Sequence, residues 1–329
     1  MFEGKKILIT GGTGSLGTAL TRRLLENNVD TIRIFSRDEL KQVKMDSEFK
    51  DHRLRFLIGD IRDKNRLHRA LEDINIVIHA AALKHVPVAE YNPFEAVKTN
   101  VYGAQNLIEA CLDNNVEHAL AIGTDKAVSP FNTYGATKLL MERLFISANY
   151  YKGNHKTKFS CVRYGNVLGS RGSIIQVFSN QIREGRKITI TDPTMTRFNI
   201  TMSQALDLIM RALKTGTGGE VFIPKLKAYT VGDIKDAIVE LMKKKNEVER
   251  IPVRPGEKYH ECLISKEELR NTFETEHDYI LFEQQTQNHD FEKMIDAKKS
   301  DLKQEYSSDK VKKLTKEELE QIILNENVL

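Results

Sequence analysis

The sequence predicts an α/β fold in which a doubly wound parallel sheet precedes a smaller second lobe. Short β-branched runs alternate with amphipathic helical stretches through the first half of the chain, and a glycine-rich turn follows the first run. From about Gly169 the alternation weakens and polar loops such as TDPTMTRF and RPGEKYHE appear. A chain of 329 residues with 40% hydrophobic residues can bury one sizeable core.

The elements of this fold can be placed along the chain. Runs rich in β-branched residues predict strands at Lys6–Thr10, Thr31–Phe35, Leu54–Ile58, Ile76–His79, His118–Ile122 and Phe159–Arg163. Apolar residues that recur at three- and four-residue steps predict helices at Leu16–Asn27, Lys64–Leu71, Pro93–Asn114 and Tyr134–Tyr150. Near the C-terminus, Thr315 and Glu318 form a capping-box pattern that predicts a last helix through Leu324.

The composition excludes several classes of protein. The net charge of +4 is evenly spread, which argues against nucleic-acid binding. The cysteines form no CxxC pair and indicate neither a disulfide framework nor a zinc site; they are Cys111, Cys161 and Cys262. The chain has no leader pattern and no apolar stretch of membrane length, so we expect a cytoplasmic protein without a membrane partner. His79 and His85 lack Glu or Cys partners at ligand spacing, so we expect no bound metal.

The glycine-rich turn indicates a dinucleotide site. Its glycines are spaced G-x-x-G-x-x-G between the first strand and the first helix. Backbone N–H groups can therefore face a pyrophosphate at the helix N-terminus, although an ordinary tight turn is the alternative. The cofactor contacts expected here are Gly11, Thr13, Gly14, Ser15, Leu16 and Gly17.

The end of the second strand favours NADP over NAD. An NAD site usually carries an acidic residue there, whereas this chain has Ser36 and Arg37. Arg37 can stack on adenine and pair with a ribose 2′-phosphate. Asp38 and Glu39 follow at positions that also fit a helix N-cap. Asp60, after the third strand, fits either the adenine amino group or a helix cap.

These signals divide the chain in two. We expect residues 1–168 to form an NADP-binding domain of Rossmann type. Residues 169–329 are expected to form mainly a substrate-binding lobe and a C-terminal tail, with some segments returning to the sheet.

A tyrosine and a lysine mark the expected reacting centre. Tyr134 and Lys138 share one helical face, so we expect the ammonium to lower the pKa of the phenol and Tyr134 to accept a proton during hydride transfer. A solvated helix surface is the alternative. Thr124 ends the fifth strand, where open α/β sheets bind ligands, and suffices as the hydroxyl donor for plain hydride transfer. Asp125 and Lys126 therefore indicate a second acid/base pair for elimination of water, with a surface ion pair as the alternative.

These residues lie in strings that resemble a known enzyme family. The strings, in chain order, are TGGTGSLG, SRDELKQ, GDIRD, HAAALKHVPVAEYNP, TDKA, YGATK, RYGNVLGSRGS, MTRF and RPGEKYHE. Together they resemble the soluble inverting UDP-N-acetylglucosamine 4,6-dehydratases, which are extended short-chain dehydrogenases/reductases. The resemblance implies an NADP-dependent hydro-lyase acting on a UDP-sugar, and a homo-oligomer, with a hexamer as one size. It also implies a product used for surface glycans or for nonulosonic acids of the pseudaminic acid type.

The resemblance further implies the reaction steps. Tyr134 takes the C4 hydroxyl proton while hydride leaves C4 for NADP, and the resulting ketone acidifies C5–H. Lys126 removes that proton, Asp125 protonates the departing C6 hydroxyl, and hydride returns to C6. Lys126 then protonates C5 from the opposite face, which inverts the configuration. A lysine base must be neutral, and we expect Lys138 and the nicotinamide cation to favour that form.

By the same resemblance, further residues contact the two ligands. Expected near the cofactor are Ser36, Arg37, Asp38, Glu39, Leu40, Lys41, Asp60, Ile61, Ala80 and Lys84, besides Tyr134 and Lys138. Expected near the nucleotide sugar are Lys84, Asn166, Val167, Arg197, Arg254 and Glu257. Two positions depart from the family pattern, because Asn199 stands where a large aromatic is usual and Gly123 where serine is common.

Two rival functions remain. A UDP-sugar 4-epimerase on the same scaffold uses Tyr134, Lys138 and Thr124 and leaves Asp125 and Lys126 idle. A non-catalytic NADP sensor keeps the glycine turn but does not need Tyr134, so the intact tyrosine argues against it.

Overall fold

A computed structural model describes residues 1–170, 172–244, 246–282 and 296–329, so Arg171 of the GSRGS string lies outside the described residues. Within these ranges the largest sheet has ten strands, in the order β15-β13-β14-β9-β6-β5-β4-β1-β2-β3. They are β1 Lys6–Thr10, β2 Thr31–Ser36, β3 Leu54–Ile58, β4 Ile76–His79, β5 His118–Ile122, β6 Lys158–Val162, β9 Glu220–Pro224, β13 Thr272–Glu274, β14 Asp278–Phe282 and β15 Lys298–Lys299.

The sheet confirms the predicted doubly wound architecture. All the predicted strands form, and β1 to β6 with β9 run parallel. Strand β1 pairs with β2 on one side and β4 on the other, so the strand order reverses between β1 and β4. A ligand crevice is expected at such a switch point, outside the carboxyl ends of the strands. Strands β13, β14 and β15 extend the sheet in antiparallel fashion beyond β9.

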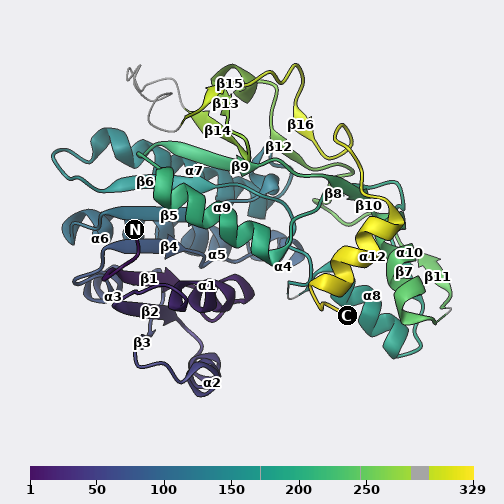
Figure 1. The fold of residues 1–329 in the computed structure, drawn as a ribbon, viewed down its shortest axis with the longest axis horizontal. Helices are drawn as coiled ribbons and strands as arrows, with labels where there is room; N and C mark the ends of the chain where they lie inside the picture. Colours follow the sequence, from purple (N-terminus) through teal and green to yellow (C-terminus); the bar gives the residue numbers. More distant parts are fainter. Residues whose placement is uncertain (171, 245, 283–295) are drawn as a thin grey trace.

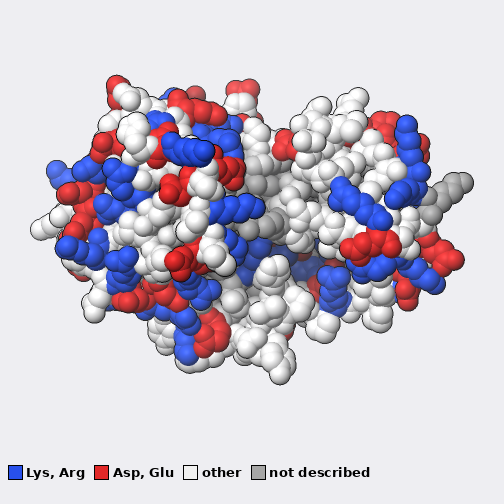
Figure 2. Space-filling view, turned by 90° about the horizontal axis from the view of Figure 1, so that it is seen from below, with Lys and Arg blue, Asp and Glu red and all other residues white. Residues whose placement is uncertain are grey.

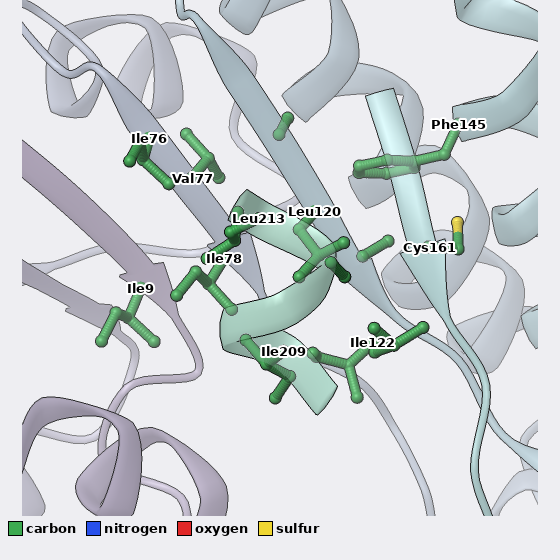
Figure 3. Close-up of a cluster of buried hydrophobic side chains, with 14 of the residues drawn as sticks. Ile9, Ile76, Val77, Ile78, Leu120, Ile122, Phe145, Cys161, Ile209 and Leu213 are labelled. Atoms are coloured by element: carbon green, nitrogen blue, oxygen red, sulfur yellow. The ribbon is translucent and has the colours of Figure 1, made fainter. Parts of the chain in front are cut away.

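Helices cover both faces of the sheet (Figure 1). On one face α1 contacts α9, and on the other α3, α6 and α7 pack side by side. Figure 3 shows Ile209 and Leu213 of α9 directed at Ile78 and Leu120 of the sheet, and all four side chains are buried. The helices of this body are α1 Ser15–Leu25, α2 Glu39–Phe49, α3 Lys64–Ala70, α4 Val86–Tyr91, α5 Pro93–Val97, α6 Gly103–Asp113, α7 Thr133–Tyr151 and α9 Met202–Thr215.

The helix predicted over Pro93–Asn114 forms, but it contains a π-helical turn that the periodicity does not predict. The structure has α5, then a π-helical turn over Lys98–Tyr102, then α6. The turn places the buried side chain of Asn100 against the loop after β4, where Oδ1 accepts from the Leu83 N–H at 2.8 Å and Nδ2 donates to the Leu83 carbonyl at 3.0 Å. Satisfying this buried backbone segment favours the local π-turn, a feature often found near functional sites.

The smaller lobe has a hydrophobic cluster of its own, which includes Ile175, Ile234, Ile238, Leu319 and Ile323. Its helices are α8 Ile174–Arg183, α10 Val231–Met242 and α12 Lys316–Asn325. The short strands outside the main sheet are β7 Ile188–Ile190, β8 Thr196–Phe198, β10 Ala228–Thr230, β11 Val248–Arg250, β12 Cys262–Ile264 and β16 Tyr306–Ser307. The predicted capping box of the last helix is confirmed, since the Thr315 hydroxyl accepts from the Glu318 N–H at 3.2 Å.

None of the helices in the described ranges is both long and apolar enough to cross a lipid bilayer.

Candidate active site

The glycine-rich turn joins β1 to α1 with unusually close packing. Gly11 has φ of 66°, and a Cβ there would lie 2.9 Å from the Ala81 backbone. A Cβ on Gly17 would overlap the Gly12 carbonyl oxygen, so both positions require glycine. Gly14 is the N-cap of α1 and offers no side-chain cap, which leaves the first backbone N–H groups of the helix available to an anion.

A cavity of about 600 Å³ opens beside this turn, at the carboxyl ends of the parallel strands. Figure 2 shows the molecule hollowed between its larger body and its smaller lobe, with Lys and Arg side chains gathered along the hollow. Many of the predicted site residues line the cavity together: Gly11, Gly14, Ser15, Leu16, Gly17, Ala80, Lys84, Thr124, Lys126, Tyr134, Lys138, Asn166 and Val167. An adjoining cavity of about 350 Å³ is lined by Thr13 and Lys41, together with Ser15 and Lys84.

The remaining residues predicted near the cofactor lie around the ends of β2 and β3. The Arg37 side chain is 59% exposed, with Nη1 3.5 Å from Oδ2 of Asp60. Asp60 also pairs with Arg62 at 2.7 Å and does not cap α3. Asp38 is the N-cap of α2, where Oδ1 accepts from the Lys41 N–H at 3.0 Å.

The other four residues predicted near the cofactor here have different surroundings. The Ser36 hydroxyl accepts from Nε2 of Gln42 at 3.0 Å, which holds the start of α2 against β2. Glu39 and Leu40 lie in the first turn of α2, and Leu40 is exposed. Ile61 is buried and packs where a Cβ on Gly103 would lie 2.7 Å away, so its side chain belongs to the core.

Asp125, which is buried, and Lys126, which is 18% exposed, form an acid/base pair on a short 3₁₀ turn that follows β5. The carboxyl of Asp125 is 1% exposed; its Oδ1 accepts from Nζ of Lys126 at 3.1 Å and from the Thr124 hydroxyl at 3.0 Å. Its Oδ2 is buried without a hydrogen-bond partner among the described residues. Nζ of Lys126 also donates to Oδ1 of Asn166 at 3.0 Å. The surface ion pair considered for this turn is therefore excluded by its burial.

The electrostatics of the pair differ from the expectation for Lys126. Burial opposes the charge on Lys126, but the carboxylates of Asp125 and Glu261 outweigh it and raise the pKa of Lys126. Lys138, the protein cation predicted to make Lys126 neutral, is not among the charges that shift the pKa of this amine. Burial raises the pKa of Asp125, and Lys126 opposes this rise.

Tyr134 and Lys138 project from the first turns of α7, which is capped by the Asn132 side chain. Burial raises the pKa of Tyr134, and the cation that opposes the rise is Lys126, while Thr124 shares a hydrogen bond with the phenol. The predicted lowering of the phenol pKa by Lys138 is therefore wrong, because Lys138 is not among the groups that shift it. Nζ of Lys138 instead donates to the Ile122 carbonyl at 2.5 Å, and burial lowers the pKa of Lys138 to about 8.

The residues expected at the sugar nucleotide differ in their surroundings. Arg197 is buried; Nη1 donates to the Tyr259 carbonyl at 3.0 Å and Nη2 lies 3.2 Å from Oε1 of Glu257. Arg254 is exposed on the loop that leads to Glu257. Asn199 is buried, and its Oδ1 has no hydrogen-bond partner in the described part of the chain.

The packing around Gly123 and His79 explains why these residues occupy their positions. A Cβ on Gly123 would lie 2.5 Å from the Val162 carbonyl oxygen, so a serine does not fit without a shift of β6. Nδ1 of His79 shares a 2.8 Å hydrogen bond with the Thr10 hydroxyl, and its ring stacks on Phe145. His79 is therefore a packing residue, as predicted.

Two residues of the site were not foreseen. Glu261 is 3% exposed, and its Oε1 lies 3.3 Å from Nζ of Lys126. Asn100 holds the loop after β4 and also donates to the Thr137 hydroxyl of α7 at 3.0 Å. Glu261 ends the RPGEKYHE string, which was the only available signal, and Asn100 was hidden inside an apparently continuous helix.

Comparison with known proteins agrees with this geometry. The polysaccharide biosynthesis protein family matches residues 7–283. The chain belongs to this family. A UDP-N-acetylglucosamine 4,6-dehydratase (inverting) of Campylobacter jejuni is 48% identical over 85% of this chain and 84% of its own. A UDP-glucose 4-epimerase of Rickettsia rickettsii is 39% identical over 98% of this chain and 96% of its own.

Solved structures share the fold of this polysaccharide biosynthesis protein. The X-ray structure of Pen from Bacillus thuringiensis superposes with a TM-score of 0.94, at 42% identity, over 100% of both chains. More distant nucleotide-sugar epimerases and dehydratases have the same Rossmann-type fold, and several of their structures contain NAD. The suspected relationship to the inverting dehydratases is confirmed.

Proposed function

We propose that the chain is an NADP-dependent, configuration-inverting UDP-N-acetylglucosamine 4,6-dehydratase. The observation that carries the proposal is the buried contact of Asp125 with Lys126 beside Tyr134, on the wall of the cavity next to the glycine turn. Plain hydride transfer needs no such second acid/base pair. The inverting dehydratase of Campylobacter jejuni, at 48% identity, supports the same assignment.

The residues of the turn fit a dinucleotide. Gly11 and Gly17 let the turn pack closely on Ala81 and Gly12, and the uncapped N-terminus of α1 suits a pyrophosphate. Arg37 is exposed at the end of β2, while Asp38 is engaged as a helix cap, which favours a 2′-phosphate over a free ribose. When bound, NADP supplies a hydride acceptor and donor; every other step falls to the chain.

The protein residues then carry out the proton transfers. Tyr134 accepts the proton of the C4 hydroxyl, with Thr124 as its hydrogen-bond partner. Lys126 removes the proton from C5 after losing its own proton, which its 18% exposed side chain can release to solvent. Asp125, whose pKa burial raises, protonates the departing C6 hydroxyl. Lys126 then returns a proton to C5 on the opposite face, which accounts for inversion.

The nucleotide part of the substrate contacts residues from both parts of the chain. We assign Lys84, Asn166 and Val167 to this ligand because they line the cavity. We also assign Arg197, Arg254 and Glu257 to this ligand, because guanidinium groups can hold a diphosphate and Arg197 pairs with Glu257 at 3.2 Å. A 6-deoxy-4-keto UDP-sugar suits the synthesis of surface glycans or nonulosonic acids in the cytoplasm.

We also propose a homo-oligomer. Large side chains that remain exposed on helices include Phe94 of α5, Tyr102 of the π-turn and Leu140 of α7. Because α5 and α7 pack together, these residues offer a shared apolar surface to a second copy. Sedimentation equilibrium that gives only the 37.6 kDa monomer would contradict this part of the proposal.

A second candidate function is 4-epimerisation, because the Rickettsia rickettsii relative is named UDP-glucose 4-epimerase. The mass of the product separates the two. Purified protein incubated with NADP and UDP-N-acetylglucosamine should give a product lighter by one water, with a 6-methyl signal in its proton NMR spectrum. A product of unchanged mass, with UDP-N-acetylgalactosamine as the new species, establishes the epimerase instead.

A further inference from the structure

Glu261 is buried at the site but plays no part in the steps above. It directly precedes β12, and its backbone N–H and carbonyl groups both form hydrogen bonds with Ser308. Its N–H donates to the Ser308 hydroxyl at 2.9 Å, and its carbonyl accepts from the Ser308 N–H at 2.8 Å. The side chain is 3% exposed. A carboxylate held this firmly and removed from water needs a compensating charge.

That charge is the ammonium of Lys126. Oε1 of Glu261 lies 3.3 Å from Nζ of Lys126 and 4.0 Å from Nε of Arg197. The other oxygen, Oε2, has no hydrogen-bond partner within the described residues. The carboxylate therefore acts mainly on Lys126, because Arg197 directs its Nη1 to backbone carbonyls and its Nη2 to Glu257.

The surroundings of Nζ match the three donors of an ammonium. Asp125 accepts at 3.1 Å and Asn166 at 3.0 Å, and Glu261 stands as the third acceptor at 3.3 Å. These acceptors come from three separate segments: the turn after β5, the loop after β6 and the residue before β12. Without any one of these three acceptors, Nζ of Lys126 is no longer held in a single orientation.

We propose that Glu261 is a positioning residue for Lys126: it fixes the direction of Nζ at the cavity wall and sets the pH at which the amine becomes a base. The second half of this statement rests on the proposed function, whereas the first concerns the folded chain alone. Glu261 has no contact with the reacting atoms of its own and acts through Lys126.

The sign of the pH effect follows from the charges that face Lys126. Asp125 of its own turn and Glu261 favour the ammonium, while Arg197 of β8 opposes it. Tyr134 of α7 and Tyr229 of β10 also interact with Lys126 and are neutral phenols at ordinary pH. Glu261 itself is held in its charged form against burial by Lys126, Arg197 and Lys258, which together lower its pKa. Neutralising Glu261 therefore lowers the pH at which Lys126 loses its proton.

The test titrates Lys126 directly in Glu261→Gln, an amide of the same shape. The full-length protein is labelled with ¹³C at the lysine ε-carbons, and the Lys126 signal is assigned by its loss in Lys126→Arg. We expect the Lys126 midpoint to fall by about one pH unit or more in Glu261→Gln. The matched control is Glu268→Gln, whose carboxylate faces Arg163 at 2.9 Å in the same region of the chain and should leave the midpoint unchanged.

A second measurement uses the pH profile of kcat for water loss. The acidic limb should move to lower pH in Glu261→Gln, with a lower plateau because Nζ is less well oriented. Glu261→Asp keeps the charge at a greater distance and should shift both quantities by less; it also serves if Glu261→Gln does not fold. An unchanged Lys126 midpoint in either soluble variant overturns the proposal. If the midpoint shifts but the wild-type protein loses no water from its sugar substrate, the positioning role stands and the dehydratase assignment fails.

Discussion

Gly135 and Lys126 lie so close that a Cβ on Gly135 would overlap the carbonyl oxygen of Lys126. This contact presses the first turn of α7 onto the 3₁₀ turn after β5, so that Tyr134 shares one wall of the cavity with Lys126. The relative position of the two acid/base systems is thus set by the absence of one methyl group.

Gly135→Ala should therefore separate the phenol from the amine. We expect kcat to fall by about 10²-fold, because displacement by about an ångström is costly in an arranged site, while NADP affinity changes little. Steady-state kinetics and a fluorescence titration with NADP measure the two quantities. Ala136→Ser, at the next and exposed position of α7, is the control and should behave as wild type. Full activity in Gly135→Ala would show that the two turns can move apart without disturbing the site, which would contradict this prediction.

Asp125→Asn should slow water loss without stopping proton removal at C5. The amide keeps the shape but cannot protonate a departing hydroxyl, so we expect kcat to fall by about 10²- to 10⁴-fold. Exchange of the C5 hydrogen with D₂O should continue, since Lys126 is still present. Asp63→Asn, the exposed N-cap of α3, is the control. Equal losses of exchange and of dehydration in Asp125→Asn would contradict its role as the acid.

Arg37→Ala should weaken NADP more than NAD. The exposed guanidinium is available to a 2′-phosphate, and losing one charge-assisted hydrogen bond costs about tenfold or more in affinity. Isothermal titration with both dinucleotides measures the ratio. Lys44→Ala, on α2 but beyond the end of β2, should leave the ratio as it is. Equal losses for the two cofactors would place the 2′-phosphate elsewhere.

The free energy of unfolding should depend on His79 below neutral pH. Burial lowers the pKa of His79 from 6.5 to about 3. Between pH 6.5 and about 3, His79 is therefore protonated in the unfolded chain and neutral in the folded chain. Stability is therefore lost as the pH falls below about 6.5, by about 1.4 kcal/mol per pH unit for this group. Urea unfolding at several pH values should show a shallower slope in His79→Gln, whereas the exposed control His155→Gln should keep the wild-type slope.

Much of the fold could be predicted because it rests on local pattern. The strands at Lys6–Thr10 and His118–Ile122 are mostly apolar or β-branched runs, and a glycine-rich turn between a strand and a helix is typical of a dinucleotide-binding fold. Tyr134, Asp125 and Lys126 were predictable for the same reason, because each lies in a short string next to a strand or helix end.

The rest depends on contacts that no local pattern reports. Glu261 is far from Lys126 in the sequence, and only the folding of the smaller lobe brings the two together. The raised pKa of Lys126 could therefore not be predicted from the sequence. The π-turn at Asn100 lies inside the helix that the periodicity predicts, and it forms because a buried side chain must satisfy the Leu83 backbone. Both misses arise where tertiary structure overrides local sequence.

The central claim is that Lys126 is the base at C5, and isotope exchange tests it most directly. Wild-type protein, Lys126→Ala and Lys126→Arg are incubated with NADP and UDP-N-acetylglucosamine in D₂O, and proton NMR follows the C5 hydrogen. Wild type should incorporate deuterium at C5, while both variants should still bind NADP and show no incorporation. Wild-type rates of deuterium incorporation in Lys126→Ala would remove Lys126 from the mechanism and with it the acid/base role of the Asp125–Lys126 pair.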